Sequence, residues 1–228
     1  MIDTLNNKVF VFQNIHKSAQ TMKNLLEQFA DSADFMFMQE ALFSHIRNTS
    51  STTSELGPPI HMAWQEVQHF NKFHKTQVCI YINRRLLSTF RLSADPNASH
   101  DPNVLVLTVT DRVMHHTASM VCLYNLPKSG NSAVHAFFHL LPNLDDLMVV
   151  QGDFNLHSQD WDPLVSQSPR IATDLLAALT LSELTLVNDD GLPTWHHKCN
   201  KPAVLDLLFI ADQLLQQCSC AFENDKVG

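Results

Sequence analysis

The sequence is poor in basic residues. It holds 15 Lys and Arg against 23 Asp and Glu, which gives a formal net charge of -8. This balance argues against a protein that grips nucleic acid through a broad basic face. It does not exclude a nuclease, because carboxylates gathered around a divalent metal ion lower the net charge while the ion restores a local positive potential.

Long apolar runs and C-x-x-C cysteine pairs are also absent. No apolar run approaches the roughly 18 residues of a membrane-spanning helix. The first residues, 1–12, lack a basic region followed by an apolar stretch, so we expect no secretory signal. The five cysteines are odd in number, and Cys79 and Cys122 lie in apolar, strand-like runs. A reduced intracellular chain is the simplest interpretation.

The length and the remaining composition indicate one globular unit. The chain has 228 residues, 45% of them apolar and 17% charged, which is ordinary for a protein with a sizeable core. No linker requires a division into two parts. We therefore expect a single domain over residues 1–228.

Apolar strands that end in a polar residue recur along the chain. Such runs lead to Asn14, to Glu40, to Tyr124 and to the pair Asp153 and Asn155. In α/β sheets, ligands collect beyond the ends of the strands. The pattern therefore predicts that these side chains gather in one active site.

The stretch 145–157, DDLMVVQGDFNLH, is the centre of this pattern. Alternation along an extended chain points Asp153 and Asn155 to the same side and turns Phe154 into the core. The alternative is a strand-to-loop turn with a capping aspartate. The residues of this stretch alone do not decide between the two.

A lone carboxylate, Asp206, stands within the apolar run VLDLLFI of residues 204–210. A charged acid buried in a strand must be paired or bound to a metal ion. The alternative is an acid near a strand end that is less buried than the pattern suggests.

The other segments alternate between strand and helix patterns. Helices are predicted after Ser18, after Ser132 and after Ser168-Pro169, each opened by a capping serine. Residues 61–67 and 77–82 read as antiparallel strands, and 104–109 and 119–124 as further strands. Residues 47–59 and 93–103 read as polar surface loops. Arg84-Arg85 could contact a phosphate backbone, or could form a solvated strand edge.

The polar residues at the strand ends are carboxylates, carboxamides and a phenol, without a nucleophilic serine or cysteine. Acids and amides suit Mg²⁺, which takes oxygen ligands and keeps water and substrate phosphate in its remaining positions. Such an ion can neutralise charge on a phosphoryl group while a nearby carboxylate activates water. We expect Mg²⁺, with Mn²⁺ as the alternative.

Six motifs in order carry a family resemblance. They are QN (13–14), QE (39–40), YNLP (124–127), GDFNLH (152–157), PTW (193–195) and LDLLF (205–209). This series resembles the endonuclease/exonuclease/phosphatase (DNase I-like) superfamily, and most of all the endonuclease domains of fungal non-LTR retrotransposons. The resemblance covers about residues 9–228 and implies a four-layer α/β sandwich, with two mixed β-sheets face to face and helices outside.

The resemblance also implies roles for the residues at the strand ends. Glu40 would be the main Mg²⁺ ligand, and Asn14 would hold the metal-site network or a phosphate oxygen. Asp153 would align or activate the water. Asn155 and Tyr124 would hold the scissile phosphate and its developing charge.

Asp206 and three departures from the family pattern complete the comparison. One departure is Ala203, near a position where the family often has Ser or Arg. Asp206 matches an aspartate that orients a catalytic histidine or supports the metal shell. The family's last motif, Ser-Asp-His, would begin about where the sequence stops at Gly228. His16 stands where repair-type relatives carry an acidic metal ligand. We expect the missing motif to impair activity.

These observations predict a Mg²⁺-dependent enzyme that nicks DNA, intracellular and nuclear if it acts on genomic DNA. We expect DNA as the substrate, no membrane association and no obligate protein partner. One alternative is a phosphatase of the same superfamily that acts on small phosphoesters. The other is an inactive retroelement remnant that at most binds nucleic acid or a protein.

Overall fold

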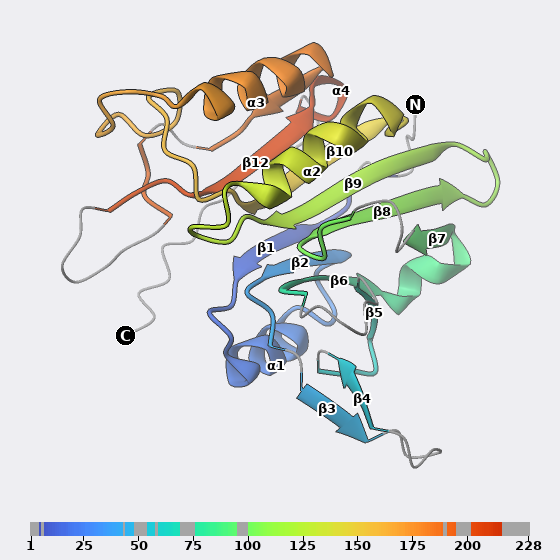
Figure 1. Cartoon of the computed structure of the whole chain (residues 1–228). Helices are drawn as coiled ribbons and strands as arrows, with labels where there is room; N and C mark the ends of the chain where they lie inside the picture. Colours follow the sequence, from blue (N-terminus) through green and yellow to red (C-terminus); the bar gives the residue numbers. More distant parts are fainter. Residues whose placement is uncertain are drawn as a thin grey trace.

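The computed structural model describes residues 5, 7–42, 44–47, 54–57, 59–68, 76–94, 100–188, 191–194 and 202–215. Two β-sheets lie face to face, and helices cover their outer faces (Figure 1). The smaller sheet has the strand order β1-β2-β6-β5, in which only β1 and β2 pair in parallel. Its strands are β1 Phe10–Asn14, β2 Phe35–Gln39, β5 Trp64–Gln68 and β6 Val78–Asn83.

The larger sheet has the strand order β11-β12-β10-β9-β8-β7. Here β9 and β10 are parallel and the other neighbours are antiparallel, so both sheets are mixed. Its strands are β7 Phe90–Ala94, β8 Val104–Asp111, β9 Thr117–Tyr124, β10 Leu147–Asp153, β11 Leu184–Leu186 and β12 Asp206–Ala211.

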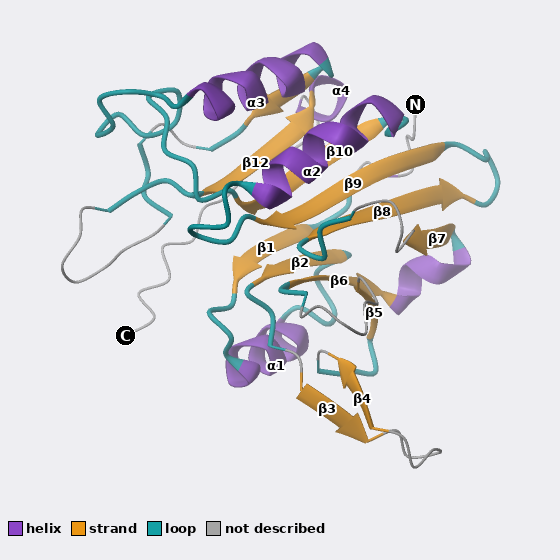
Figure 2. Cartoon of the chain, in the orientation of Figure 1, coloured by secondary structure: helices purple, strands orange, loops and turns teal. Residues whose placement is uncertain are grey.

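The helices form the two outer layers (Figure 2). α1 Ala19–Gln28 covers the smaller sheet, and α2 Ser132–Leu140 and α3 Arg170–Leu181 cover the larger one. Shorter pieces are α4 Asp212–Leu215 and the 3₁₀ helices η2 Arg84–Ser88 and η3 Leu141–Asn143. Among the described residues, no helix has the length and apolar character to span a membrane.

Three clusters of buried apolar side chains hold these layers together. One fills the space between the sheets, and the other two lie between each sheet and its helices. Strand alternation explains the division, because Met120 and Cys122 of β9 face the other sheet while Val121 and Leu123 face the helices. Strands buried on both faces read as continuous apolar runs. The predicted four-layer α/β sandwich is confirmed.

Two of the predicted loops contain strands. Residues 47–59 were expected to be a polar loop, but β3 Ser44–Arg47 and β4 Ser54–Gly57 form an antiparallel hairpin. The second predicted loop, 93–103, overlaps the end of β7. The sequence did not reveal these strands, because the alternation of apolar and polar residues that predicts a strand is weak in both segments.

The predicted serine caps are right at one helix and wrong at two. Ser18 caps α1 by accepting a hydrogen bond from the backbone N–H of Thr21. Ser132 is the first residue of α2 rather than its cap. Ser168 lies one residue before the Pro169 cap of α3, and its hydroxyl bonds to the hydroxyl of Ser158 at 2.8 Å. Both serines are off by a single position, and the N-cap role depends on that position.

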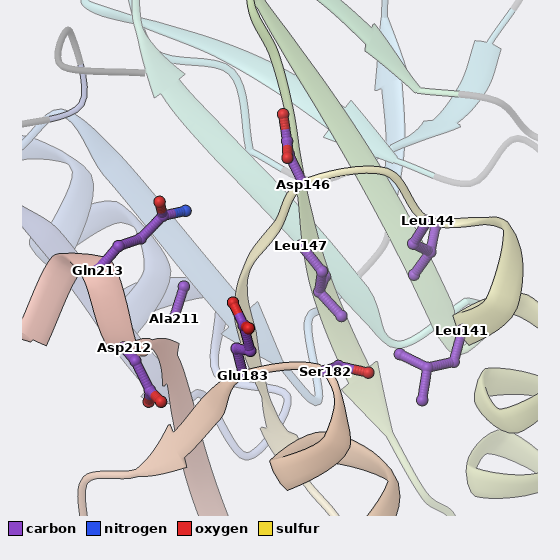
Figure 3. Close-up of a pocket in the computed structure, with 9 residues that line it drawn as sticks. All are labelled: Leu141, Leu144, Asp146, Leu147, Ser182, Glu183, Ala211, Asp212 and Gln213. Carbon is purple, nitrogen blue, oxygen red and sulfur yellow. The ribbon is translucent and has the colours of Figure 1, made fainter. Parts of the chain in front are cut away.

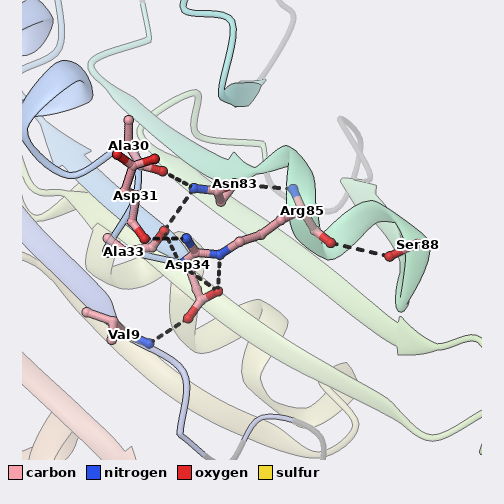
Figure 4. Close-up of polar contacts among 8 residues, drawn as sticks. All are labelled: Val9, Ala30, Asp31, Ala33, Asp34, Asn83, Arg85 and Ser88. Carbon is pink, nitrogen blue, oxygen red and sulfur yellow. Dashed lines mark hydrogen bonds and ion pairs between the residues drawn. The ribbon is translucent and has the colours of Figure 1, made fainter.

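A polar network around Asp34 ties the first strand to the rest of the smaller sheet (Figure 4). The buried Asp34 carboxylate accepts hydrogen bonds from the backbone N–H of Val9 at 3.0 Å and from Arg85 Nε at 3.2 Å. Arg85 also donates to the carbonyl oxygens of Asp31 and Ala33 at 2.7 and 2.9 Å. Arg85 therefore has a structural role, which neither interpretation of the Arg84-Arg85 pair anticipated.

Replacing Asp34 by alanine is expected to lower the free energy of unfolding by about 2 kcal/mol, because it removes hydrogen bonds to a charged acceptor. The loss is not larger because the Arg85 side chain is 40% exposed and keeps contact with water. Urea denaturation would measure it, with Asp174→Ala on α3 as the control for an exposed acid. A change no larger than that of the control would contradict the role assigned to Asp34.

Candidate active site

The predicted site residues meet at one edge of the space between the two sheets. Asn14 and Tyr124 are the last residues of β1 and β9, and Glu40 follows β2 directly. Asp153, the last residue of β10, lies opposite Tyr124 on one side and opposite Asp206 on the other. Because β12 runs antiparallel to β10, its first residue lies at the same edge. The structure thus brings all of these side chains together.

A carboxamide bridge joins the two halves of the site. Asn14 Nδ2 lies 3.1 Å from Asp153 Oδ2 and 3.4 Å from Glu40 Oε1. Asn14 and Glu40 come from the smaller sheet, whereas Asp153 comes from the larger one. The site is therefore divided between the sheets, and its geometry depends on how the two sheets are placed relative to each other.

The loops after β1 and β2 hold this bridge in place. The backbone N–H of His16 donates to Asn14 Oδ1 at 3.1 Å, and the N–H of Lys17 donates to the carbonyl oxygen of Glu40 at 2.9 Å. With its oxygen so engaged, Asn14 turns its NH₂ group toward the carboxylates. This orientation suits a residue that holds the metal-site network. The His16 ring is 70% exposed, with Nδ1 3.8 Å from Glu40 Oε1.

A turn places Asn155 beside Asp153. Asp153 is the last residue of β10, and Asn155 has a φ of 46°, so strand alternation does not continue to it. Instead, its backbone N–H donates to Asp153 Oδ1 at 3.1 Å, and its side chain donates to the carbonyl oxygen of Asn125 at 2.8 Å. Phe154 is fully buried, as expected. The alternative of a turn stabilised by the aspartate describes the local geometry correctly.

Gly152 allows β9 and β10 to approach closely just before the site. A Cβ atom added to Gly152 would lie 2.1 Å from the carbonyl oxygen of Leu123 and 2.8 Å from its Cγ. Real Cβ atoms do not come so close to a backbone oxygen. The glycine of the GDFN motif is therefore required by strand packing.

Replacing Gly152 by alanine is expected to lower the free energy of unfolding by roughly 3 kcal/mol, at the upper end of overpacking costs, because the backbone of β9 must move. The movement also displaces the adjacent Asp153. Thermal or urea unfolding would measure the loss, with Ala136→Gly on α2 as a control for an ordinary alanine/glycine exchange of roughly 1 kcal/mol. A Gly152→Ala variant that is as stable as the wild type would contradict this prediction, because it would show that β9 and β10 can move apart at little cost in free energy.

Asp206 lies at the start of β12 and is only partly buried, in agreement with the alternative that it stands near a strand end. Thr194 Oγ1 accepts hydrogen bonds from the backbone N–H groups of Leu205 and Asp206 at 3.0 and 2.9 Å. Among the described residues, the buried Oδ1 of Asp206 has no hydrogen-bond partner. One carboxylate oxygen is thus available to accept a hydrogen bond.

Burial and neighbouring charges raise the pKa values of Asp153, Asp206 and Tyr124. Burial raises the pKa of Asp153, and the charges of Asp206 and Glu40 raise it further. Burial also raises the pKa of Asp206, although a hydrogen bond from Thr194 lowers it in part. Burial and the charge of Glu40 raise the pKa of Tyr124, which keeps its phenol neutral and able to donate. Such a concentration of negative charge favours binding of a cation.

The donor set fits a hard divalent cation. Glu40 and Asp153 offer carboxylate oxygens on either side of Asn14. Mg²⁺ is commonly bound by one or two protein carboxylates, so this pair is sufficient. Within the described ranges, no group of three or more His, Cys, Asp and Glu side chains is arranged to enclose a metal ion. An open site with two carboxylates therefore suits Mg²⁺ or Mn²⁺ better than a closed zinc site.

A cavity of about 300 Å³ lies at the other end of the larger sheet (Figure 3). Asp146 and Asp212 line it, and they stand just before β10 and just after β12, at the ends opposite Asp153 and Asp206. Glu183 adds a third acid. None of the predicted site residues line this cavity, and its acids would repel a phosphate group.

Two supporting residues were not assigned a role from the sequence. Asn125 holds Asn155 through its carbonyl oxygen, and its side chain donates to the carbonyl oxygen of Phe154 at 2.8 Å. Thr194 holds the backbone of Asp206. Each belongs to a motif that carried the family resemblance, YNLP or PTW. Their positions in those motifs were the signal from which a role at the site could have been predicted.

Comparisons with known proteins find one matching family and several similar folds. Residues 118–228 match the sequence model of a family described as endonuclease-reverse transcriptase. No curated protein sequence matches the chain. Among solved structures, the endonuclease domain of TRAS1, a telomere-specific non-LTR retrotransposon, has a TM-score of 0.66 and 15% identity, over 91% of this chain and 86% of that one.

Two further structures share the fold. The AP endonuclease LMAP from Leishmania major has a TM-score of 0.65 and 13% identity, over 93% of this chain and 81% of that one. The human Nocturnin catalytic domain has a TM-score of 0.51 and 14% identity, over 85% and 74% of the two chains. The chain therefore resembles the endonuclease/exonuclease/phosphatase superfamily, because residues 118–228 match its endonuclease-reverse transcriptase model and the fold is similar to that of the TRAS1 endonuclease domain.

Proposed function

We propose that this protein is a divalent-metal-dependent endonuclease that hydrolyses phosphodiester bonds in DNA, as retrotransposon endonucleases do when they nick a target. The observation that carries the proposal is the bridge from Glu40 through Asn14 to Asp153, with Tyr124 and Asp206 beside it. The endonuclease-reverse transcriptase description and the TRAS1 endonuclease support a nuclease. On this proposal, the protein acts in the nucleus when its target is genomic DNA.

Glu40 and Asp153 are the residues that would hold Mg²⁺, or Mn²⁺ in its place. The bound cation would neutralise charge on a phosphate oxygen. The Asp153 carboxylate, with its two oxygens fixed by Asn14 and Asn155, orients the attacking water and accepts its proton. The water oxygen bonds to phosphorus as the ester bond to the leaving oxygen breaks.

The neutral donors of the site would act on the phosphate. Tyr124 keeps its proton because its pKa is raised, so it can donate a hydrogen bond to a phosphate oxygen. Asn155 is held by Asn125 and Asp153, which fixes its carboxamide before substrate arrives. Asp206 is a positioning residue whose Oδ1, which has no partner among the described residues, would accept a hydrogen bond from a neighbouring donor.

Conversion of supercoiled plasmid to the relaxed circle tests the proposal. We expect nicking with Mg²⁺ or Mn²⁺ and none with EDTA. We expect Glu40→Gln to lower the rate by about 100-fold, as for the loss of one charge-stabilising group, while the surface control Asp174→Asn leaves it unchanged. The absence of nicking with both Mg²⁺ and Mn²⁺, or full activity of Glu40→Gln, would overturn the proposal.

The same preparations separate the two alternatives. Release of inorganic phosphate from a small phosphoester, such as an inositol phosphate, without plasmid nicking would identify a phosphatase. Absence of both activities, together with retention of DNA in a gel-shift assay, would identify a binding protein.

A further inference from the structure

A small polar cluster lies inside the apolar core, directly beneath the site. Its members are Gln39, Cys122 and Gln151, whose exposed fractions are 0%, 0% and 3%. Strand alternation turns all three toward the space between the sheets, since Phe37 and Val149, two positions earlier on β2 and β10, pack there. The cluster thus occupies the end of the inter-sheet core that is nearest the site.

Hydrogen bonds within this cluster cross from one sheet to the other. Gln39 Nε2 donates to Gln151 Oε1 and to Cys122 Sγ, the latter at 3.4 Å. Cys122 Sγ also contacts the carbonyl oxygen of Met38 at 4.0 Å. Burial raises the pKa of Cys122 to about 12, so its thiol stays neutral. Gln39 belongs to the smaller sheet, and Cys122 and Gln151 belong to the larger one.

Stability alone does not account for the cluster. Burying a carboxamide is unfavourable unless all its groups are hydrogen-bonded. In the described part of the chain, the buried Oε1 of Gln39 has no partner. Two apolar side chains of similar length would fill the same space without this cost. The buried pair of Gln39 and Gln151 therefore requires another explanation.

The positions of the cluster residues in the chain supply one. Gln39 is bonded directly to Glu40, and Gln151 and Cys122 stand two residues before Asp153 and Tyr124 on the same faces of their strands. Below the polar contacts of the site, such as that of Asn14 with Asp153, the described core between the sheets consists mainly of apolar side chains, whose contacts are not directional. A hydrogen bond is directional and short-ranged, and so it specifies the relative position of the groups that it joins.

We propose that the hydrogen-bonded pair of Gln39 and Gln151 is a positioning device that sets the two sheets in register beneath the site. It holds Glu40 at the distance from Asp153 that the Asn14 carboxamide can bridge. Cys122 completes the cluster as the second acceptor for Gln39. The role of the pair in positioning Glu40 and Asp153 for catalysis rests on the proposed function. The hydrogen bond between Gln39 and Gln151 does not depend on that function.

The test replaces both glutamines by methionine, Gln39→Met with Gln151→Met, which keeps side-chain length and removes the hydrogen bonds. The readout that needs no activity is the ¹H–¹⁵N signal of the Asn14 side-chain amide, assigned by its loss in Asn14→Asp. The second readout is Mn²⁺ affinity measured by electron paramagnetic resonance. The control is Thr110→Val with Thr117→Val, which removes a 3.1 Å hydroxyl pair within the larger sheet.

We expect the double methionine variant to stay folded, to shift the Asn14 amide signal toward that of a solvated carboxamide, and to weaken Mn²⁺ binding by about tenfold or more. The control should change neither. Should the double variant fail to fold, Gln151→Asn is used, because it shortens one partner and keeps a carboxamide. Unchanged Asn14 signals and Mn²⁺ affinity in a folded variant would overturn the inference. Neither readout requires nicking activity. Plasmid nicking by the wild-type protein is measured separately, so the failure of this inference and the failure of the proposed function can be told apart.

Discussion

Asp153→Asn is expected to lower the rate of DNA nicking by at least about 1000-fold, within the range for loss of a general base. Asparagine keeps the shape of the side chain, and its single oxygen can still accept one of the two hydrogen bonds, from Asn14 or from the backbone N–H of Asn155. It cannot accept a proton from water, and it binds a cation less well than a carboxylate. The same substitution is expected to raise the melting temperature at pH 8 in EDTA, because it removes a charge whose burial is unfavourable.

Plasmid nicking and thermal unfolding of the same preparations would show both effects. Opposite changes in activity and stability are the signature of a group held in an unfavourable environment for function. Asp160→Asn in the nearby loop is the control, since Asp160 accepts its hydrogen bond from Ser158 and contacts none of the site residues in the described structure. Nicking within tenfold of the wild type, or a lower melting temperature at pH 8, would show that Asp153 is not the base assigned here.

The assembly of the site was predictable because strand patterns are local. Apolar runs with period two specify which side chains face inward, and a polar residue at the end of such a run must lie at the rim of the core. Asn14, Tyr124 and Asp153 follow this rule. That the ends of different strands lie at one edge followed from the resemblance and from the behaviour of α/β sheets.

The features that the sequence did not predict depend on partners far along the chain. The need for glycine at position 152 comes from the carbonyl oxygen of Leu123 on the neighbouring strand. The hydrogen bond between Gln39 and Gln151 joins residues of two different sheets. The Oδ1 of Asp206, which lacks a partner within the described part of the chain, is identified only once the surrounding residues are placed. Local patterns carry no information about such pairs.

Stability of the metal-free protein is expected to fall as the pH rises, by on the order of 4 kcal/mol between pH 5 and pH 8. In the unfolded chain, Asp153 and Asp206 lose their protons near pH 4. In the folded protein, burial raises both pKa values, and nearby carboxylates raise them further, Asp206 and Glu40 at Asp153 and Glu40 at Asp206. The folded state therefore retains protons that the unfolded state has released. The free energy of unfolding falls wherever the folded state binds more protons. The contribution of these retained protons to the free energy of unfolding is fully present below about pH 4. It is lost as the pH rises through the raised pKa values of Asp153 and Asp206.

Urea unfolding in EDTA across this pH range would measure the decline. The double variant Asp153→Asn with Asp206→Asn should show a much flatter profile, because neither side chain titrates. Excess Mg²⁺ should restore stability to the wild type at pH 8 but not to the double variant, since a cation that binds only the folded state stabilises it in proportion to its affinity. A wild-type profile that rises with pH in EDTA would mean that both carboxylates are paired favourably without a metal ion. That outcome would remove the electrostatic reason for a cation at this site.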